Sequence, residues 1–308
     1  MRTRWLTCLL APVLAGALLA APAGAIKSHK LVNVVLPAGE APSAITGAGT
    51  ALYVANTLSN SLTVINAASA KVVGTRPLPS SPTAVLTTGP TIWVAMTNGT
   101  VVRYSTTTWH RQLLIAAAQT PISLVVSGKR VWIADAATNT IVVASTVDGH
   151  VIGSFSSQGK GLSSLLMVPG HLLATNATSG EVQQFDPATG DLQGTFAVRQ
   201  SPVGMALVGS MVWVVRATAH TVAVLDLAGE TISAYCPTAG LKTTGITAVG
   251  NHVLVASSAT NLVMDLKAST GKIYRGHRTG RGPAAMCFLA GRLWVTNLAN
   301  RSVDGIVL

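Results

Sequence analysis

A short strand–turn–strand unit recurs through the whole sequence, and its regular spacing restricts the possible folds severely. The first copy is residues 52–66 (LYVANTLSNSLTVIN), with an apolar strand, a polar turn and a second apolar strand. In the copies, the second residue of the first strand falls at positions 53, 93, 132, 173, 213, 254 and 294, so successive copies are 39 to 41 residues apart. A period of about 40 residues that carries only strand signals is typical of β-propeller blades.

Two further strands complete each repeat. A strand that starts near a proline or glycine, as at Pro42 and Pro82, precedes the repeated unit, and a strand that follows a polar turn comes after it. The turn at residues 186–191 (DPATGD) opens with Asp and has Gly near its end, which is a recipe for a hairpin. Apolar runs such as residues 212–215 (VWVV) are expected for strands packed on both faces. The sequence therefore predicts an all-β fold, a seven-bladed β-propeller of four-stranded blades.

Aromatic residues recur at one position of the repeat. We expect them to be core spacers between blades rather than a carbohydrate-binding platform, because the position lies inside an apolar strand. The tryptophans at this position are Trp93, Trp132, Trp213 and Trp294.

The two ends of the chain are expected to share one blade. The seventh repeat stops at residues 303–308, after its third strand, and residues 31–36 (LVNVVL) form a lone strand that resembles a fourth strand. The N-terminal strand would then close the last blade and leave no open sheet edge. We expect one propeller domain over residues 26–308.

The repeats also resemble a known family. Residues 52–56 (LYVAN) and 293–297 (LWVTN), each followed by a Ser/Asn-rich turn, look like the YVTN family of β-propeller repeats. The resemblance covers residues 26–308 and implies the propeller architecture without naming a ligand. The fourth repeat departs most from the pattern, because Leu173 replaces the aromatic residue and Gly161-Leu162 replaces the proline start.

Residues 1–25 have the pattern of a secretory signal peptide. Arg2 and Arg4 form a basic start, residues 5–20 are apolar, and residues 23–25 (AGA) are a small-residue cleavage site. The alternative is an uncleaved membrane anchor, but the apolar stretch is short for a span and contains a proline. We expect a periplasmic or secreted protein without a transmembrane span after cleavage.

The chain is basic but contains few charges. Charged residues make up 10% of the sequence, and the formal net charge of +11 falls to about +9 without residues 1–25, which hold two arginines. The basic residues are scattered, and the densest run is residues 272–281, so we expect no nucleic-acid partner. A second hypothesis is that few carboxylates suit an acidic environment, because fewer groups can destabilise the fold on protonation.

Two cysteines remain after the predicted cleavage. Cys236 is expected on an outer strand of blade 5 and Cys287 on the innermost strand of blade 7. A disulfide needs Cα atoms closer than about 7 Å, so the sequence predicts two free thiols. No cysteine pattern typical of zinc or haem occurs, and we expect no cofactor.

Propellers usually bind ligands at the mouth of the central channel, in the loops after the second strands. Asn56, Asn176 and Asn297 occupy matched positions there, where asparagine either bonds its own turn or contacts a ligand. Asp135 and Arg216 break the repeat at the same position. They are either polar anchors for a ligand or solvated loop charges.

Nothing in the sequence predicts catalysis clearly. His220 is the only histidine expected in a channel-mouth loop, and one histidine does not make a metal centre. Most carboxylates are expected in turns between third and fourth strands, at the periphery, which does not support acid/base pairing across the channel. They are Asp148, Asp186, Asp191, Asp226 and Glu230.

Two functions from different classes follow. The first is a non-enzymatic, monomeric scaffold that binds a protein or small-molecule ligand. The alternative is a metal-dependent lyase or lactonase, because residues 293–297 are similar to the repeats of virginiamycin B lyase-like proteins. That resemblance implies a divalent metal held by His and Glu at the channel, whereas the matched loops here contain no Glu and only His220. An electron-transfer propeller is disfavoured because haem motifs are absent.

Overall fold

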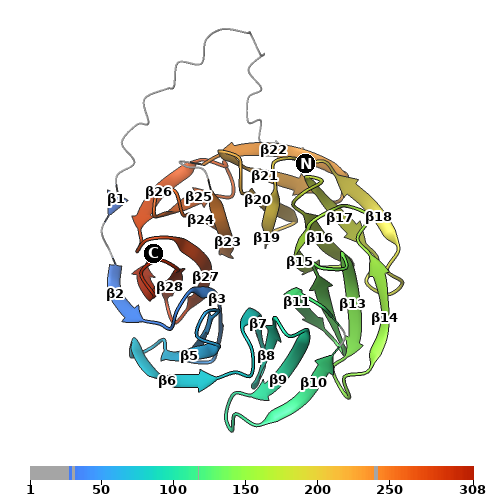
Figure 1. Cartoon of the computed structure of the whole chain (residues 1–308). Coiled ribbons are helices and arrows are strands. Elements are labelled where there is room, and N and C mark those ends of the chain that lie inside the picture. The colour runs from blue at the N-terminus through green and yellow to red at the C-terminus, as the bar shows by residue number, and fades with distance from the viewer. Residues whose placement is uncertain (1–27, 30–31, 117, 239–241) are drawn as a thin grey trace.

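The structure, a computed structural model, describes residues 28–29, 32–116, 118–238 and 242–308. These residues form seven sheets arranged around a central axis (Figure 1), which confirms the predicted seven-bladed β-propeller. The predicted signal peptide, residues 1–25, lies outside the described residues. Within the described ranges, no helix is present that is long and apolar enough to cross a membrane.

Each blade runs outward from an innermost first strand to an outermost fourth strand (Figure 1). The first strands are β3 (Pro42–Ala48), β7 (Pro82–Thr88), β11 (Pro121–Ser127), β15 (Leu162–Val168), β19 (Pro202–Val208), β23 (Thr243–Val249) and β27 (Pro283–Leu289). The second strands are β4 (Ala51–Asn56), β8 (Thr91–Met96), β12 (Arg130–Asp135), β16 (His171–Asn176), β20 (Met211–Arg216), β24 (His252–Ser257) and β28 (Arg292–Asn297). The third strands are β5 (Ser61–Asn66), β9 (Thr100–Ser105), β13 (Thr140–Ser145), β17 (Glu181–Phe185), β21 (Thr221–Asp226), β25 (Leu262–Lys267) and β29 (Ser302–Val307). The fourth strands are β6 (Lys71–Pro77), β10 (Arg111–Ala116), β14 (Val151–Ser156), β18 (Leu192–Phe196), β22 (Thr231–Pro237), β26 (Ile273–Arg278) and, for blade 7, β2 (Val32–Pro37).

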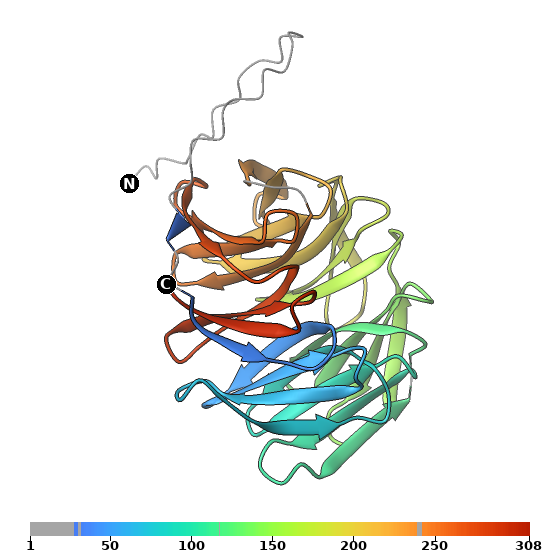
Figure 2. The same cartoon turned by 60° about the vertical axis from the view of Figure 1, so that its left-hand side comes forward.

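The N-terminal strand closes the ring as predicted. Strand β2 pairs antiparallel with β29, with Leu36 opposite Val303. Figure 2 shows this blue strand beside the red strands of the C-terminal blade. The sequence did not predict β1 (Ser28–His29), which adds to blade 6 as a fifth strand parallel to β26.

The second strands form the centre of the core. All seven have the same pattern, one half-buried residue followed by five buried ones, because a neighbouring blade packs on each face. The four repeat tryptophans are buried between blades, as predicted, and Trp93 packs with Leu124 and Ile133 of the next blade. Blade 4 forms the same four strands with buried Leu173 in place of the aromatic residue. A large side chain at this position is therefore needed for packing, and an aromatic ring is not.

The connections between strands lie on two opposite faces. The face that we call the crossover face carries the crossovers from a fourth strand to the next blade's first strand, together with the loops between second and third strands. In every blade one backbone N–H after the second strand donates to the carbonyl that precedes the first strand. These pairs are Thr57–Ala41, Thr97–Ser81, Ala136–Thr120, Ala177–Gly161, Ala217–Ser201, Ser258–Lys242 and Leu298–Gly282. The opposite face, which we call the hairpin face, carries the other turns.

Cys236 and Cys287 form no disulfide, in agreement with the predicted thiols. Cys236 is buried on β22 and Cys287 is half-buried on β27. Burial raises the pKa of the Cys287 thiol to about 11. The thiolate that would attack an oxidant or an alkylating reagent is therefore scarce at neutral pH.

Candidate functional site

Five of the six predicted site residues are each the last residue of a second strand. The structure arranges them in one ring directly beneath the crossover face, and each side chain is at most 7% exposed. They are Asn56, Asp135, Asn176, Arg216 and Asn297. Their role in ligand binding stays a prediction. The structure gives four of them a structural role, because Asn56, Asp135, Asn176 and Arg216 each bond a crossover.

Asn56 and Asn176 contact the crossovers. Asn56 and Asn297 also bond across their own loops, because their Nδ2 atoms donate to Ser61 Oγ and Ser302 Oγ at 3.2 Å. In blade 1, Asn56 Oδ1 accepts the Gly39 N–H at 3.1 Å, and Asn56 Nδ2 donates to Thr63 Oγ1 at 3.0 Å. In blade 4, the Ser157 hydroxyl donates to Asn176 Oδ1 at 2.6 Å, and Asn176 Nδ2 donates to Gln183 Oε1 at 3.2 Å. Asn56 and Asn176 thereby each link a crossover to the third strand of their own blade.

In blade 7 an ionisable residue of the third strand, and not the asparagine, holds the crossover. Gly280 N–H donates to Asp304 Oδ2 at 2.7 Å, next to Asn297. Asp304 is buried, and burial raises the pKa of its carboxyl group, against the smaller lowering effects of hydrogen bonds from Gly280 and Asn297.

A combination of three residues marks these sites in the sequence, although no single position reveals them. Blades with asparagine at the end of the second strand also have a polar third residue in the third strand and a glycine in the crossover. These triples are Asn56–Thr63–Gly39, Asn176–Gln183–Gly159 and Asn297–Asp304–Gly280. A Cβ at any of these glycines would come within 2.8 Å of the asparagine side chain, so only glycine fits.

Asp135 is a buried carboxylate without a cationic partner. It accepts backbone N–H groups from Gln119 at 2.8 Å, Thr120 at 2.9 Å and Ala137 at 3.1 Å. Burial alone would raise the pKa of Asp135, but these hydrogen bonds outweigh it and the pKa is lowered. Asp135 is therefore ionised at neutral pH and holds the crossover into blade 3.

Arg216 occupies the same position in blade 5. Its Nη1 donates to the Val198 carbonyl at 3.0 Å, and its guanidinium also bonds Thr221 and lies 4.4 Å from the centre of the Tyr235 ring. Burial lowers the pKa of Arg216, although arginine remains protonated in proteins. A full positive charge thus lies beneath the crossover into blade 5.

His220 is the one predicted site residue with an exposed side chain. It lies in the loop between β20 and β21, where its carbonyl accepts the Thr238 N–H at 2.6 Å. The structure places it on the crossover face of blade 5, in the loop that follows Arg216.

The seven first strands that surround the axis carry almost no titratable groups. Their side chains are apolar or hydroxyl-bearing, and Cys287 is the only titratable residue in these seven described strands. The described residues also contain no group of three or more His, Cys, Asp or Glu side chains that could hold a metal ion.

One buried ionic cluster lies in blade 6. Asp265 Oδ1 is 2.6 Å from His252 Nδ1, and Asp265 Oδ2 accepts from Arg275 Nε at 3.3 Å. The carboxylate is 1% exposed and is fully used by these two partners. We interpret this cluster as a structural ion pair on the hairpin side of the blade.

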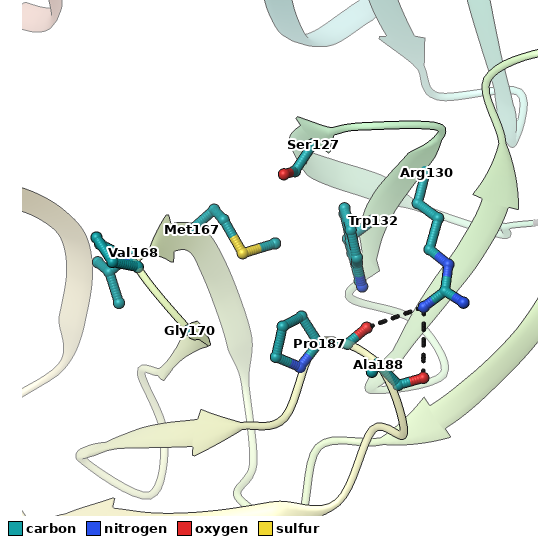
Figure 3. A pocket seen from close by; sticks show the side chains of 9 residues that line it. Ser127, Arg130, Trp132, Met167, Val168, Gly170, Pro187 and Ala188 are labelled. Atoms are coloured by element: carbon teal, nitrogen blue, oxygen red, sulfur yellow. Dashed lines mark hydrogen bonds between the residues drawn. The ribbon is translucent and has the colours of Figure 1, made fainter.

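A shallow groove on the hairpin face separates blades 3 and 4 (Figure 3), with a volume of about 520 Å³. Trp132 and Met167 contribute to its walls, and Arg130 Nη1 donates to the carbonyls of Pro187 at 3.3 Å and Ala188 at 3.4 Å. At the corresponding place between blades 1 and 2, Trp109 stacks on Tyr104 with a centroid distance of 4.9 Å. The groove therefore reflects a smaller turn residue in blade 4.

No protein-family model and no curated protein matches this chain. Among solved structures, it is similar to a chain of hydrazine synthase from Kuenenia stuttgartiensis, with a TM-score of 0.78 and 18% identity over 89% of this chain and 96% of that one. It is also similar to virginiamycin B lyase from Staphylococcus aureus, with a TM-score of 0.77 and 16% identity over 89% of this chain and 98% of that one. BamB from Moraxella catarrhalis gives a TM-score of 0.62 and 17% identity over 86% of this chain and 84% of that one. These likenesses support the propeller fold.

Proposed function

We propose that this protein is a non-enzymatic β-propeller of the YVTN-repeat type that acts as a binding scaffold in the periplasm or outside the cell. It presents its crossover face to a protein or small-molecule ligand. The observation that carries the proposal is the contrast between first strands whose only titratable residue is Cys287 and a crossover face whose loops are fixed by backbone hydrogen bonds.

The two halves of this contrast have different consequences. Acid/base and metal-assisted catalysis need several titratable or ligating groups that converge on one reacting atom. Hydroxyl and apolar side chains around the axis do not supply them. Binding instead benefits from loops that are already ordered, because less conformational entropy is lost on association. The ring of seven backbone hydrogen bonds supplies that order.

The alternative is a metal-dependent lyase, and the likeness to virginiamycin B lyase favours it. A divalent metal of the kind implied by that family would need His and Glu ligands. The loops matched in this chain offer His220 and no Glu, and the described residues hold no group of three potential ligands. The donor set does not fit the group, and we derive no step through it.

Site-directed photo-crosslinking in cells that naturally produce the protein tests the scaffold function. A photoreactive amino acid replaces His220 on the crossover face, and a matched variant carries it at Val147, which is 67% exposed on the hairpin face. We expect the variant at 220 to capture a defined partner that purified protein then binds saturably. Equal capture from both positions, or none from 220, contradicts the proposal.

Thermal unfolding with and without divalent metals separates the scaffold from the lyase. A ligand that binds only the folded state adds about 2.7 kcal/mol at 100 times its Kd. We expect no shift in Tm with Mg²⁺, Mn²⁺, Ca²⁺ or Zn²⁺. A rise that a chelator reverses, together with cleavage of a streptogramin B substrate, would establish the lyase instead.

A further inference from the structure

Three cationic side chains and one histidine lie in segments that meet at the crossover face of blade 5, although they are spread over more than 40 residues of sequence. They are Arg199, Arg216, His220 and Lys242. Backbone hydrogen bonds join the segments that carry them. Ala217 N–H donates to Ser201 O at 2.8 Å, and Lys242 N–H donates to Ala217 O at 3.1 Å. Ser201 and Lys242 therefore both contact Ala217, in the loop that follows Arg216.

No carboxylate of the described residues forms an ion pair with the buried Arg216. Its side chain is 7% exposed, and its recorded partners are carbonyl and hydroxyl oxygens and the ring of Tyr235. A buried charge is costly unless it is paired, and the buried Asp265 of blade 6 is paired with Arg275 and hydrogen-bonded to His252. A negative group that settles above Arg216 would supply the missing partner.

The exposed cations of this cluster also lack carboxylate partners. Among the described residues, the four ion pairs within 4.0 Å involve none of Arg199, His220 and Lys242. On the same face, Glu40 already pairs with Arg301 at 2.8 Å. The carboxylates of the turns between third and fourth strands lie on the hairpin face. Glu181, the first residue of β17, also lies on this face next to Gly180, and its Oε2 accepts from the Ser179 hydroxyl at 3.1 Å. Cations therefore outnumber carboxylates above blade 5, and the field there is positive.

The crossover that presents Arg199 has a fixed and unusual shape. Arg199, Gln200 and Ser201 all have positive φ, at 59°, 53° and 52°. Residues other than glycine seldom adopt a positive φ. Where they do, the surrounding structure holds the backbone in place, often at ligand-binding sites. Here Arg199 N–H donates to Gly180 O at 2.6 Å and Arg216 holds Val198 from below. The cation is thus displayed on a backbone that is already ordered.

We infer that the crossover face of blade 5 binds an acidic polypeptide segment, with Asp or Glu carboxylates on Arg199, His220 and Lys242 and above Arg216. This inference rests on the proposed scaffold function and assigns the chemistry of the partner. Guanidinium groups pair with carboxylates in a planar, two-pronged geometry, which favours such a partner. Three cations are fewer than the roughly 6–10 phosphate contacts of a strongly salt-dependent DNA-binding surface.

Fluorescence anisotropy with a labelled octaglutamate peptide tests the inference, with a Gly/Ser peptide of equal length as the neutral probe. The double variant R199Q/K242Q removes two cations from the cluster. The matched control K129Q/K272Q removes two exposed lysines from the hairpin face. We expect salt-sensitive binding that weakens about tenfold in R199Q/K242Q and by less than about twofold in the control. The variant Arg216→Gln is tested in the same assay if thermal unfolding shows that it is folded. If it is not folded, the binding of R199Q/K242Q alone decides the test.

Three results would overturn the inference. They are no binding of octaglutamate, equal loss in both double variants, or equal competition by single-stranded DNA or phosphatidylglycerol vesicles, which would indicate a general polyanion surface. Crosslinking from position 220 with no binding of the acidic peptide leaves the scaffold function standing and removes this inference alone. Failure of both experiments removes both.

Discussion

Blades 3 and 5 place opposite charges at the same buried position. Asp135 ends the second strand of blade 3 and Arg216 ends that of blade 5, and they are 2% and 7% exposed. Both hold the crossover that leads into their own blade. The crossover into blade 3 turns two backbone N–H groups toward the position, whereas the crossover into blade 5 turns the Val198 carbonyl toward it. A carboxylate only accepts and a guanidinium only donates, so the backbone of the crossover sets the sign of the charge.

The two charges differ in how completely they are satisfied. Three backbone N–H groups surround Asp135, and no carboxylate accompanies Arg216. The carboxylate of Asp135 is therefore fully hydrogen-bonded within the fold. The positive charge of Arg216 has no negative partner among the described residues, and a ligand could supply one. The same position in the repeat thus serves the fold in one blade and, on our inference, both the fold and binding in another.

The largest effect is expected at Asp135. Asp135→Ala leaves the N–H groups of Gln119, Thr120 and Ala137 without their acceptor, and unsatisfied buried donors are costly. We expect the free energy of unfolding to fall by about 3 kcal/mol, measured by urea denaturation at pH 7.

Asp135→Asn is the matched control, because its amide oxygen can still accept. We expect a loss of about 1 kcal/mol at pH 7. Since the folded pKa of Asp135 lies below its unfolded value, its contribution is present above the unfolded pKa and is lost as pH falls through the folded one. The difference between wild type and Asp135→Asn should therefore shrink at acidic pH. A constant difference from pH 7 to pH 2 would rule out the charge as its source.

A smaller effect is expected at Arg216. Arg216→Ala loses the hydrogen bond to Val198 and the contact with Tyr235, but it also removes an uncompensated buried charge. We expect a loss of about 2 kcal/mol in the free energy of unfolding. Arg216→Lys keeps the charge without the planar fork and should fall between wild type and alanine. If Arg216→Ala costs as much as Asp135→Ala, the two blades do not differ in the way described.

The smallest expected effect is an increase in the free energy of unfolding, and it concerns the buried carboxyl group of Asp304. Burial raises the folded pKa of Asp304, so the wild type loses stability as pH rises from the unfolded pKa through the folded one. Gln183 occupies the same position in blade 4 as a neutral residue. We expect Asp304→Asn to gain about 1 kcal/mol at pH 7 and nothing at low pH, where Asp304 is protonated. Denaturation at pH 7 and pH 3 checks this, and a loss at pH 7 would show that the ionised form is needed.

The fold could be read from the sequence because its information is local and repeated. Apolar strands spaced by 39 to 41 residues, prolines at the starts of first strands and glycines in the turns each act over a few residues. Even the closure by β2 followed from counting strands, since residues 31–36 look like a fourth strand and the last repeat lacks one. The pairing of β1 with β26 could not be predicted, because the two residues of β1 are too few to show a strand pattern.

The site residues show where that reasoning stops. The sequence marked Asn56, Asp135, Asn176, Arg216 and Asn297 as matched positions and placed them in the loops just after the second strands, whereas each is the last residue of its strand. It did not show that their side chains turn beneath the crossovers. That direction depends on partners such as Gly39, which lies 17 residues from Asn56 and on the preceding crossover.

The sequence alone thus determined the number of blades, the order of their strands and the way the ring closes, because each depends on periodic local patterns. Only the tertiary structure decided which polar groups are satisfied and which are left over. Arg199, Arg216, His220 and Lys242 are separate basic residues in the sequence, and the backbone contacts between two crossovers and one loop bring them together. Electrostatic interactions depend on distance and burial in space, and a linear sequence records neither.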